Sequence, residues 1–198
     1  VVLPKDFIRY KLTGQFFSDV SDASGTSLLD VGKRNWSAEM FDVLGWPSTW
    51  MPEVTESTEA STKISDDASR LTGLLAGTPV IAGGGDQAAQ AVGCGIVEEG
   101  LVSTTLGTSG VVFAQSDEYR VEPSGKLHAF CHAVPGKWHL MGVMLSAAGS
   151  FQWYKNQFGQ DEQRKEDGGG SNAYDLLTEE AETVGAGSEG LFFLPYLS

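Results

Sequence analysis

The chain has 198 residues, of which 41% are hydrophobic, and its 26 acidic against 13 basic residues give a formal net charge of −13. This length suits one well-buried domain or parts of two, and the composition is that of a globular protein. The acidic excess repels nucleic acid and anionic membrane surfaces, so neither is expected as a partner. A nucleotide site stays compatible with this charge, because a few backbone N–H groups and a metal ion can hold phosphates locally.

Neither the cysteines nor the histidines have the spacing of a metal site. Cys94 and Cys131 lie in separate segments and are interpreted as small buried residues. His128, His132 and His139 fall within twelve residues, but no third ligand accompanies a pair of them, which favours core or loop positions.

The chain contains no run of about 18 apolar residues that could form a membrane helix. Its first residues also lack the basic region followed by an apolar run that marks a signal peptide. A cytosolic protein is therefore expected. The chain starts without methionine and ends in an apolar run, which is typical of a central part of a longer protein.

The first 78 residues predict short helices joined by polar connections. Pro4 and Gly14 bound an N-terminal helix. Small polar residues over 19–26 are typical of a loop or a helix cap. Ser37 suits the N-cap of a second helix, and residues 65–73 predict a third.

Strands are concentrated in the middle of the chain. An apolar strand from residue 78 ends in glycines at 83–85, and an Ala-rich helix begins directly behind Asp86. Two β-branched runs on either side of residues 107–110 predict a β-hairpin, and a second hairpin turns near 135–137.

The last third of the chain predicts two helices. The first covers about 146–158, and residues 160–172 are polar and Gly-rich, which indicates a mobile loop. Ser171 or Asn172 caps the second helix, which runs to Thr183.

Asp86 is the first of three places that could carry chemistry. A favoured N-cap residue after a glycine turn explains much of this segment. Three successive glycines also clear side chains from around the carboxylate, which favours a base or metal ligand at the mouth of a sheet.

The same segment matches the dinucleotide fingerprint Gly-x-Gly-x-x-Ala over residues 83–88, so an oxidoreductase is an alternative. Asp86 at the helix start would place a like charge where the pyrophosphate binds. The chain also continues into hairpins, without a second strand–helix unit. Both features disfavour the oxidoreductase.

The second and third places are rich in small residues. A turn at 106–110 could simply reverse the chain, or its N–H groups and the hydroxyls of Thr108 and Ser109 could surround a phosphate. Residues 145–153 pass from strand to helix, which permits close helix–sheet packing around Trp153 or a nucleotide lying against the backbone.

Taken together, these motifs resemble the FGGY family of carbohydrate kinases. The resemblance covers nearly the whole chain, and the order and spacing of the motifs make it specific. It rests on residues 3–14, 21–26, 84–89, 106–110, 130–132, 138–142 and 146–153.

The resemblance implies an α/β chain of the actin-like ATPase (ribonuclease H-like) fold. The family has two such domains with the active site in the cleft between them. Residues 1–98 correspond to the end of the first, sugar-side domain. Residues 99–198 correspond to the start of the second, nucleotide-side domain.

The resemblance also assigns site residues. Asp86 stands at the position of the family's catalytic base, and Gln87 at a position that hydrogen-bonds a sugar hydroxyl. Glutamine is the choice of glycerol kinases there, and Asn is frequent in kinases of D-xylulose. Thr108 is expected to reach the terminal phosphates of ATP, and the nucleotide-binding set is Gly107, Thr108, Ser109, Gly110, Ala148 and Gln152.

The implied activity is ATP-dependent phosphorylation of a ketopentose, with Mg²⁺ on the phosphates. Within the family, the sequence is most similar to members that convert D-xylulose to D-xylulose 5-phosphate. Kinases of glycerol or L-ribulose, and a non-catalytic actin-like nucleotide-binding module, stay open, as does a homodimer. The family's Asp-x-Gly-Thr phosphate loop and adenine-binding segment lie outside these residues, so the 198 residues alone are expected to be inactive.

Overall fold

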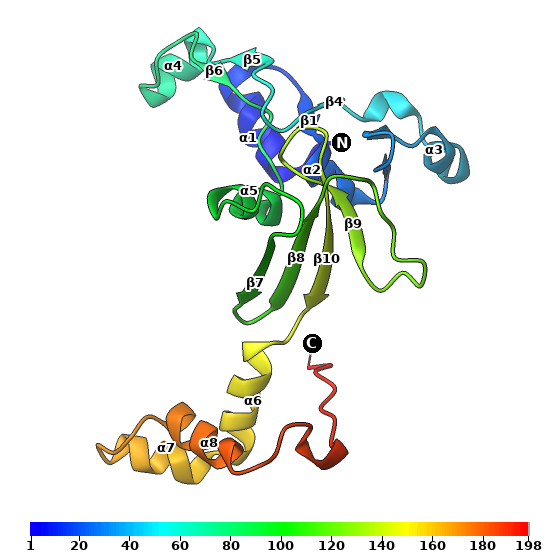
Figure 1. Ribbon diagram of the computed structural model, residues 1–198. Helices are drawn as coiled ribbons and strands as arrows, with labels where there is room; N and C mark the ends of the chain where they lie inside the picture. The colour runs from blue at the N-terminus through cyan, green and yellow to red at the C-terminus, as the bar shows by residue number, and fades with distance from the viewer. Residues whose placement is uncertain (198) are drawn as a thin grey trace. The chain divides into compact units, whose positions relative to one another are not determined.

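The computed structural model describes residues 1–197 and combines helices with short strands (Figure 1). By their internal contacts the residues form two compact units. The first contains Val1–Ser103 and Val112–Gly142, and the second contains Thr104–Val111 and the residues from Val143 onward. Among the described residues, no helix is long and apolar enough to cross a membrane. The predicted domain boundary between residues 98 and 99 stays a prediction.

The first unit begins with α1 (Pro4–Thr13), as predicted. Pro4 occupies the first turn, where its missing N–H costs nothing, and Gly14 ends the helix with a left-handed φ of 76°. Asp6, Arg9 and Thr13 lie on the buried side of this helix. The N-terminal helix therefore presents polar groups to the interior of its unit.

Residues 19–26, for which the sequence indicated a loop or a helix cap, contain a cap followed by two short helices. The elements there are α2 (Val20–Ala23) and η1 (Ser24–Thr26). Asp19 is the N-cap of α2, and its carboxylate accepts the N–H groups of Ser21 and Asp22. Asp19 ends β1 (Phe17–Asp19), which pairs in parallel with β4 (Glu53–Thr55).

Two further predicted helices are confirmed, the first of them with its predicted cap. Ser37 accepts the N–H of Met40 at the start of α3 (Ala38–Leu44). Ser65 accepts the N–H of Ala68 at the start of α4 (Asp66–Thr72), which ends at Gly73.

The remaining elements before residue 80 have two or three residues. They are the antiparallel pair β2 (Leu29–Asp30) and β3 (Asn35–Trp36), the 3₁₀ turn η2 (Ser48–Trp50), and the antiparallel pair β5 (Thr62–Lys63) and β6 (Pro79–Val80). The strand predicted before the glycines is therefore only Pro79–Val80. It leads through residues 81–85 into α5 (Asp86–Gly93).

The largest sheet confirms both predicted hairpins. Its strand order is β7 (Val102–Leu106), β8 (Gly110–Ser116), β10 (Trp138–Met144) and β9 (His128–Cys131). Strands β9 and β10 are antiparallel, with His139 opposite Phe130. Buried Phe113 of β8 stacks on His139 at 4.1 Å between ring centroids.

The two cysteines differ in environment. Cys131 is fully buried and joins Val20, Ala23 and Leu29 in a hydrophobic cluster, as predicted. Cys94 is exposed, so its prediction as a buried residue was wrong. It lies at the C-cap of α5, beyond the face of that helix that is buried through Ala88 and Ala91.

Helices dominate the second unit. Helix α6 (Ala148–Phe158) starts two residues later than predicted, and α8 (Ala173–Glu182) has the predicted Asn172 cap. The unit also contains η3 (Ser188–Gly190).

The loop predicted over residues 160–172 was wrong for its first part, which is α7 (Gln160–Asp167). Most of its residues are strong helix formers, and most of them face water, so a polar composition is compatible with a helix here. Two ion pairs at i,i+3 spacing, Asp161–Arg164 and Glu162–Lys165, support it.

Candidate functional site

Asp86 is the first residue of α5, and Gly85 before it is the N-cap. The Asp86 carboxylate accepts the N–H of Gln87 through Oδ1 at 2.8 Å. The residue is exposed, and within residues 1–197 no other hydrogen bond to its carboxylate is present. The first turn of a helix favours negative charge, so this position suits a carboxylate whose second oxygen is open to a ligand.

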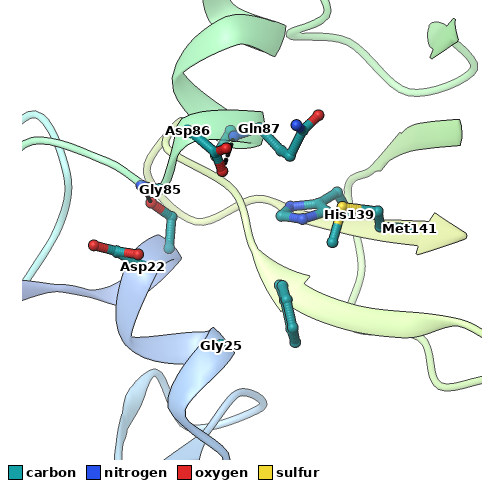
Figure 2. A pocket seen from close by; sticks show the side chains of 10 residues that line it. Asp22, Gly25, Gly85, Asp86, Gln87, His139 and Met141 are labelled. Carbon is teal, nitrogen blue, oxygen red and sulfur yellow. Dashed lines mark hydrogen bonds between the residues drawn. The ribbon is translucent and has the colours of Figure 1, made fainter. Parts of the chain in front are cut away.

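An open pocket of about 160 Å³ lies beside Asp86 in the first unit (Figure 2). Its walls come from the start of α5, from α2 and η1, and from strands β9 and β10. Figure 2 shows Asp86 and Gln87 on α5 and His139 and Met141 on β10 around the same space. The lining residues are Ser21, Asp22, Gly25, Gly85, Asp86, Gln87, Ala88, Phe130, His139 and Met141.

The three glycines before Asp86 have different roles. Gly83 has a φ of 85°, a conformation that other residues rarely adopt. A Cβ on Gly84 would lie 3.3 Å from Ser21 Oγ, and one on Gly85 would lie 3.4 Å from Asp22 Cα. The sequence interpretation that these glycines clear space for a ligand is therefore only part of the explanation, because α2 occupies much of that space.

A cluster of charges adjoins the pocket. Lys5 Nζ lies 2.6 Å from Asp6 Oδ1, 2.8 Å from Asp19 Oδ1 and 3.7 Å from Asp22 Oδ2. Burial raises the pKa of Asp22, Lys5 opposes this, and the charges of Asp19 and Asp6 add to it. Burial lowers the pKa of Lys5, but the surrounding carboxylates outweigh that effect and raise it overall.

An uncharged imidazole forms part of the pocket wall. His139 is 3% exposed, and burial, with a smaller contribution from His132, lowers its pKa to about 3. Its ring is therefore neutral near pH 7. His132 is also buried, with Nε2 3.0 Å from the carbonyl of Ile96, and Val134 N–H donates to its Nδ1. Both histidines thus belong to the core.

The second predicted place, the turn between β7 and β8, belongs to the second unit and is mostly exposed. Ser109 Oγ donates to the carbonyl of Leu145 at 3.0 Å. The Thr108 side chain makes no hydrogen bond to any other described residue. Of the two hydroxyls predicted to surround a phosphate, that of Thr108 is open and that of Ser109 already has an acceptor.

Carbonyl groups of this turn accept hydrogen bonds from the N–H groups at the start of α6. Ala147 N–H and Gly149 N–H donate to the Thr108 carbonyl at 2.7 and 3.2 Å, and Ala148 N–H donates to the Gly107 carbonyl at 3.0 Å. These are the N–H groups that a helix start leaves without intrahelical partners. Because the protein uses them, they are not available to hold an anion. The structure thus brings Gly107, Thr108 and Ala148 together.

Gln152 lies one turn after Ala148 on the same side of α6, and both residues are exposed. The predicted nucleotide residues therefore form one exposed region of the second unit. Within residues 1–197, no three His, Cys, Asp or Glu side chains are grouped so that they could hold a metal ion.

Sequence reasoning missed several residues of the pocket around Asp86. Ser21 and Asp22 were interpreted as members of a loop or cap and of a family motif, Phe130 and Met141 as parts of motifs, and His139 also as a core or loop residue, but none as a site residue. Alternation along β10 puts His139 and Met141 on one face, which is a signal that the sequence contains. Nothing in the sequence indicates that this face meets α2 and α5.

Comparisons with known proteins show similarity to sugar kinases. Residues 1–93 match the N-terminal domain of the FGGY family of carbohydrate kinases. Similarity to individual sugar kinases extends over the whole chain. Residues 1–93 of the chain thus resemble the N-terminal domain of the FGGY carbohydrate kinases, and the predicted α/β, actin-like fold class is confirmed.

Individual relatives are more specific. The chain is 42% identical to the xylulose kinase of Escherichia coli K12, covering 100% of this chain and 38% of that protein. A solved xyloylose kinase from Brucella ovis is 42% identical with a TM-score of 0.83, over 100% of this chain and 38% of that one. A gluconate kinase from Lactobacillus acidophilus is 26% identical with a TM-score of 0.81, over 98% and 37%. The chain thus spans under two fifths of the length of these relatives.

Proposed function

We propose that the protein containing this chain transfers a phosphoryl group from ATP to a hydroxyl of D-xylulose, with Asp86 as the general base. The family supports the reaction class, and the xylulose kinase of E. coli, identical at 42% of positions, supports the sugar. The observation that carries the proposal is the exposed Asp86 carboxylate beside a small pocket.

The proposed chemistry follows from the transition state of phosphoryl transfer. That state is loose, so a protein contributes mainly by positioning the reactants and stabilising charge. A carboxylate at hydrogen-bond distance orients the attacking hydroxyl and accepts its proton. One oxygen of Asp86 is held by the Gln87 N–H, which leaves the other for the sugar.

The size and lining of the pocket support a small polar substrate. Its volume of about 160 Å³ is below the roughly 300–1,000 Å³ of pockets for drug-sized ligands. Gln87 can donate and accept hydrogen bonds beside Asp86, as a sugar hydroxyl requires. Neutral His139 and apolar Phe130 and Met141 offer a wall without charge.

For the nucleotide side we propose the residues that the sequence indicated. Thr108 has the open hydroxyl and would donate to a terminal phosphate, and Ser109 and Gly110 shape its turn. Mg²⁺ prefers oxygen ligands and keeps several waters, so it would arrive on the phosphates of ATP without a dedicated protein cage. The proposed set is Gly107, Thr108, Ser109, Gly110, Ala148 and Gln152.

Two alternatives to this function are considered, and the first has an observation in its favour. A gluconate kinase has nearly the same fold over this length, so a different sugar, including glycerol or L-ribulose, is the near alternative. Gln87 is the residue that the resemblance assigns to glycerol kinases at this position, which supports glycerol among these sugars. A nucleotide-binding module without sugar chemistry is the distant alternative.

The test measures ADP release by the full-length protein with D-xylulose, glycerol, L-ribulose and gluconate. We expect a preference for D-xylulose, and an Asp86→Asn variant that is slower by about 10²–10⁴-fold, because it keeps the shape but loses the base. Asp66→Asn is the matched control, because it removes an exposed carboxylate from the first position of another helix of the same unit, α4. Preference for another sugar would correct the substrate. If neither the wild type nor Asp86→Asn releases ADP in a sugar-dependent way, the nucleotide-binding module is favoured.

A further inference from the structure

We propose that Ser21 is a positioning residue for Asp86, holding the glycine segment 83–85 in the place from which α5 starts. This inference rests on the proposed function, in which Asp86 is the base. Ser21 lies in α2, 65 positions before Asp86 in the sequence. Its role comes from one hydrogen bond to Gly85, the residue before Asp86.

That hydrogen bond is donated by the backbone N–H of Gly85 to Ser21 Oγ, at 3.0 Å. Gly85 directly precedes Asp86, so the bond is one residue from the proposed base. Ser21 Oγ in turn donates its proton to Asp19 Oδ2. Because its proton is committed to Asp19, the hydroxyl does not act as a donor to a ligand in the pocket, although Ser21 lines it.

Asp19 fixes the direction of the Ser21 hydroxyl. Its carboxylate is fully buried and accepts the Ser21 N–H at 2.8 Å and the Ser57 hydroxyl at 2.7 Å on the same oxygen, Oδ2. Lys5 Nζ lies 2.8 Å from its other oxygen. Hydrogen bonds to an ionised acceptor are short and strong, so this carboxylate is a rigid anchor.

The same anchor reaches the other end of the glycine segment. Gly83 N–H donates to the backbone carbonyl of Ser57 at 3.0 Å, and the Ser57 side chain donates to Asp19. Both ends of the segment 83–85 are therefore tied to residues that contact one buried carboxylate.

These bonds matter because glycine has no side chain to restrict its backbone. A segment of three glycines can move unless backbone hydrogen bonds hold it, and Asp86 moves with it. A catalytic group needs its productive geometry within about 0.5 Å, and a displacement of about 1 Å can cost roughly 10²-fold in rate.

The chain offers a matched control at Ser24, which directly follows α2. Ser21 and Ser24 are each 4% exposed. Ser24 Oγ also accepts a distant backbone N–H at 3.0 Å, but from Cys131 in β9 instead of Gly85. Replacing either serine by alanine removes one buried hydroxyl and its bond to a distant backbone N–H, and only Ser21→Ala removes the bond next to Asp86.

The experiment compares Ser21→Ala and Ser24→Ala in the full-length protein by steady-state kinetics with D-xylulose, thermal unfolding, and hydrogen–deuterium exchange. We expect kcat to fall tenfold or more in Ser21→Ala, with the KM for ATP changed less than twofold. Ser24→Ala should keep kcat within twofold at a similar loss of thermal stability. Exchange of the amides at 83–86 should accelerate only in Ser21→Ala.

Equal kcat values in the two variants would overturn the inference, as would unchanged exchange at 83–86 in Ser21→Ala. If Ser21→Ala does not fold, Ser21→Cys keeps a side chain and weakens the acceptor, and the same pattern is expected of it. A wild-type protein without sugar-dependent ADP release would instead overturn the proposed function. The exchange measurement would then still decide whether Ser21 holds the segment.

Discussion

His139 couples protein stability to pH. Its pKa of about 3 in the folded protein compares with about 6.5 for an exposed histidine, so the unfolded chain binds a proton over this interval and the folded chain does not. Below pH 6.5 the free energy of unfolding should therefore fall as pH falls, by up to about 1.4 kcal/mol per pH unit from this residue.

The prediction is checked by urea unfolding of wild type and His139→Phe between pH 8 and pH 4.5. Phenylalanine keeps a ring against Phe113 and has no buried Nδ1 without a hydrogen-bond partner. We expect a shallower decline with acid in the variant. At pH 8 the imidazole is neutral in both states, so measurements there isolate the packing change. Equal slopes below pH 6.5 would contradict the assignment to His139.

At the scale of elements, the contact between the β7–β8 turn and α6 depends on a glycine. A Cβ on Gly110 would lie 2.9 Å from Ala147 Cβ, which is too close for the turn to keep its place. We expect Gly110→Ala to lower the free energy of unfolding by about 1–3 kcal/mol, the usual cost of overpacking. Denaturant unfolding measures this directly.

Gly107 is the matched control for this element. A Cβ there would lie 3.8 Å from the carbonyl oxygen of Ser109, an ordinary contact, and the residue has no positive φ. Gly107→Ala should therefore change the free energy of unfolding by less than about 0.5 kcal/mol. If both variants lose the same stability, close packing of Gly110 on α6 is not what this turn requires.

At the scale of the whole molecule, the 198 residues span 38% of the E. coli relative. A run of large apolar side chains from Leu191 to Leu194 is exposed, with Leu191 at 81%, Phe192 at 86% and Leu194 at 68%. Exposed apolar area of this kind favours association. We expect the purified 198 residues to self-associate in light scattering and to show no sugar-dependent ADP release.

The full-length protein is the control for that measurement under the same conditions. Sugar-dependent ADP release by the 198 residues alone would show that they contain every group the reaction needs. It would contradict the expectation that the family's Asp-x-Gly-Thr loop and adenine-binding segment are required.

The sequence by itself determined the features that depend on neighbouring residues. Pro4 and Gly14 bound a helix, and Ser37 and Ser65 cap two more. The small residues at 107–110 form the turn of a hairpin. Caps and turns of this kind are stabilised within a few residues. The ordered motifs also indicated a resemblance to the FGGY carbohydrate kinases, which the comparisons confirm. The helix at 160–167 was local too, and was missed because its polarity was interpreted as a loop.

Only the tertiary structure decided which distant segments meet. Asp86 lies in a pocket with Asp22 and His139, and Gly85 is held by Ser21. These contacts depend on how a short helix, a glycine segment and a sheet pack together, and no local pattern encodes that. The exposure of Cys94 follows from the same cause, since burial is decided by what covers a residue.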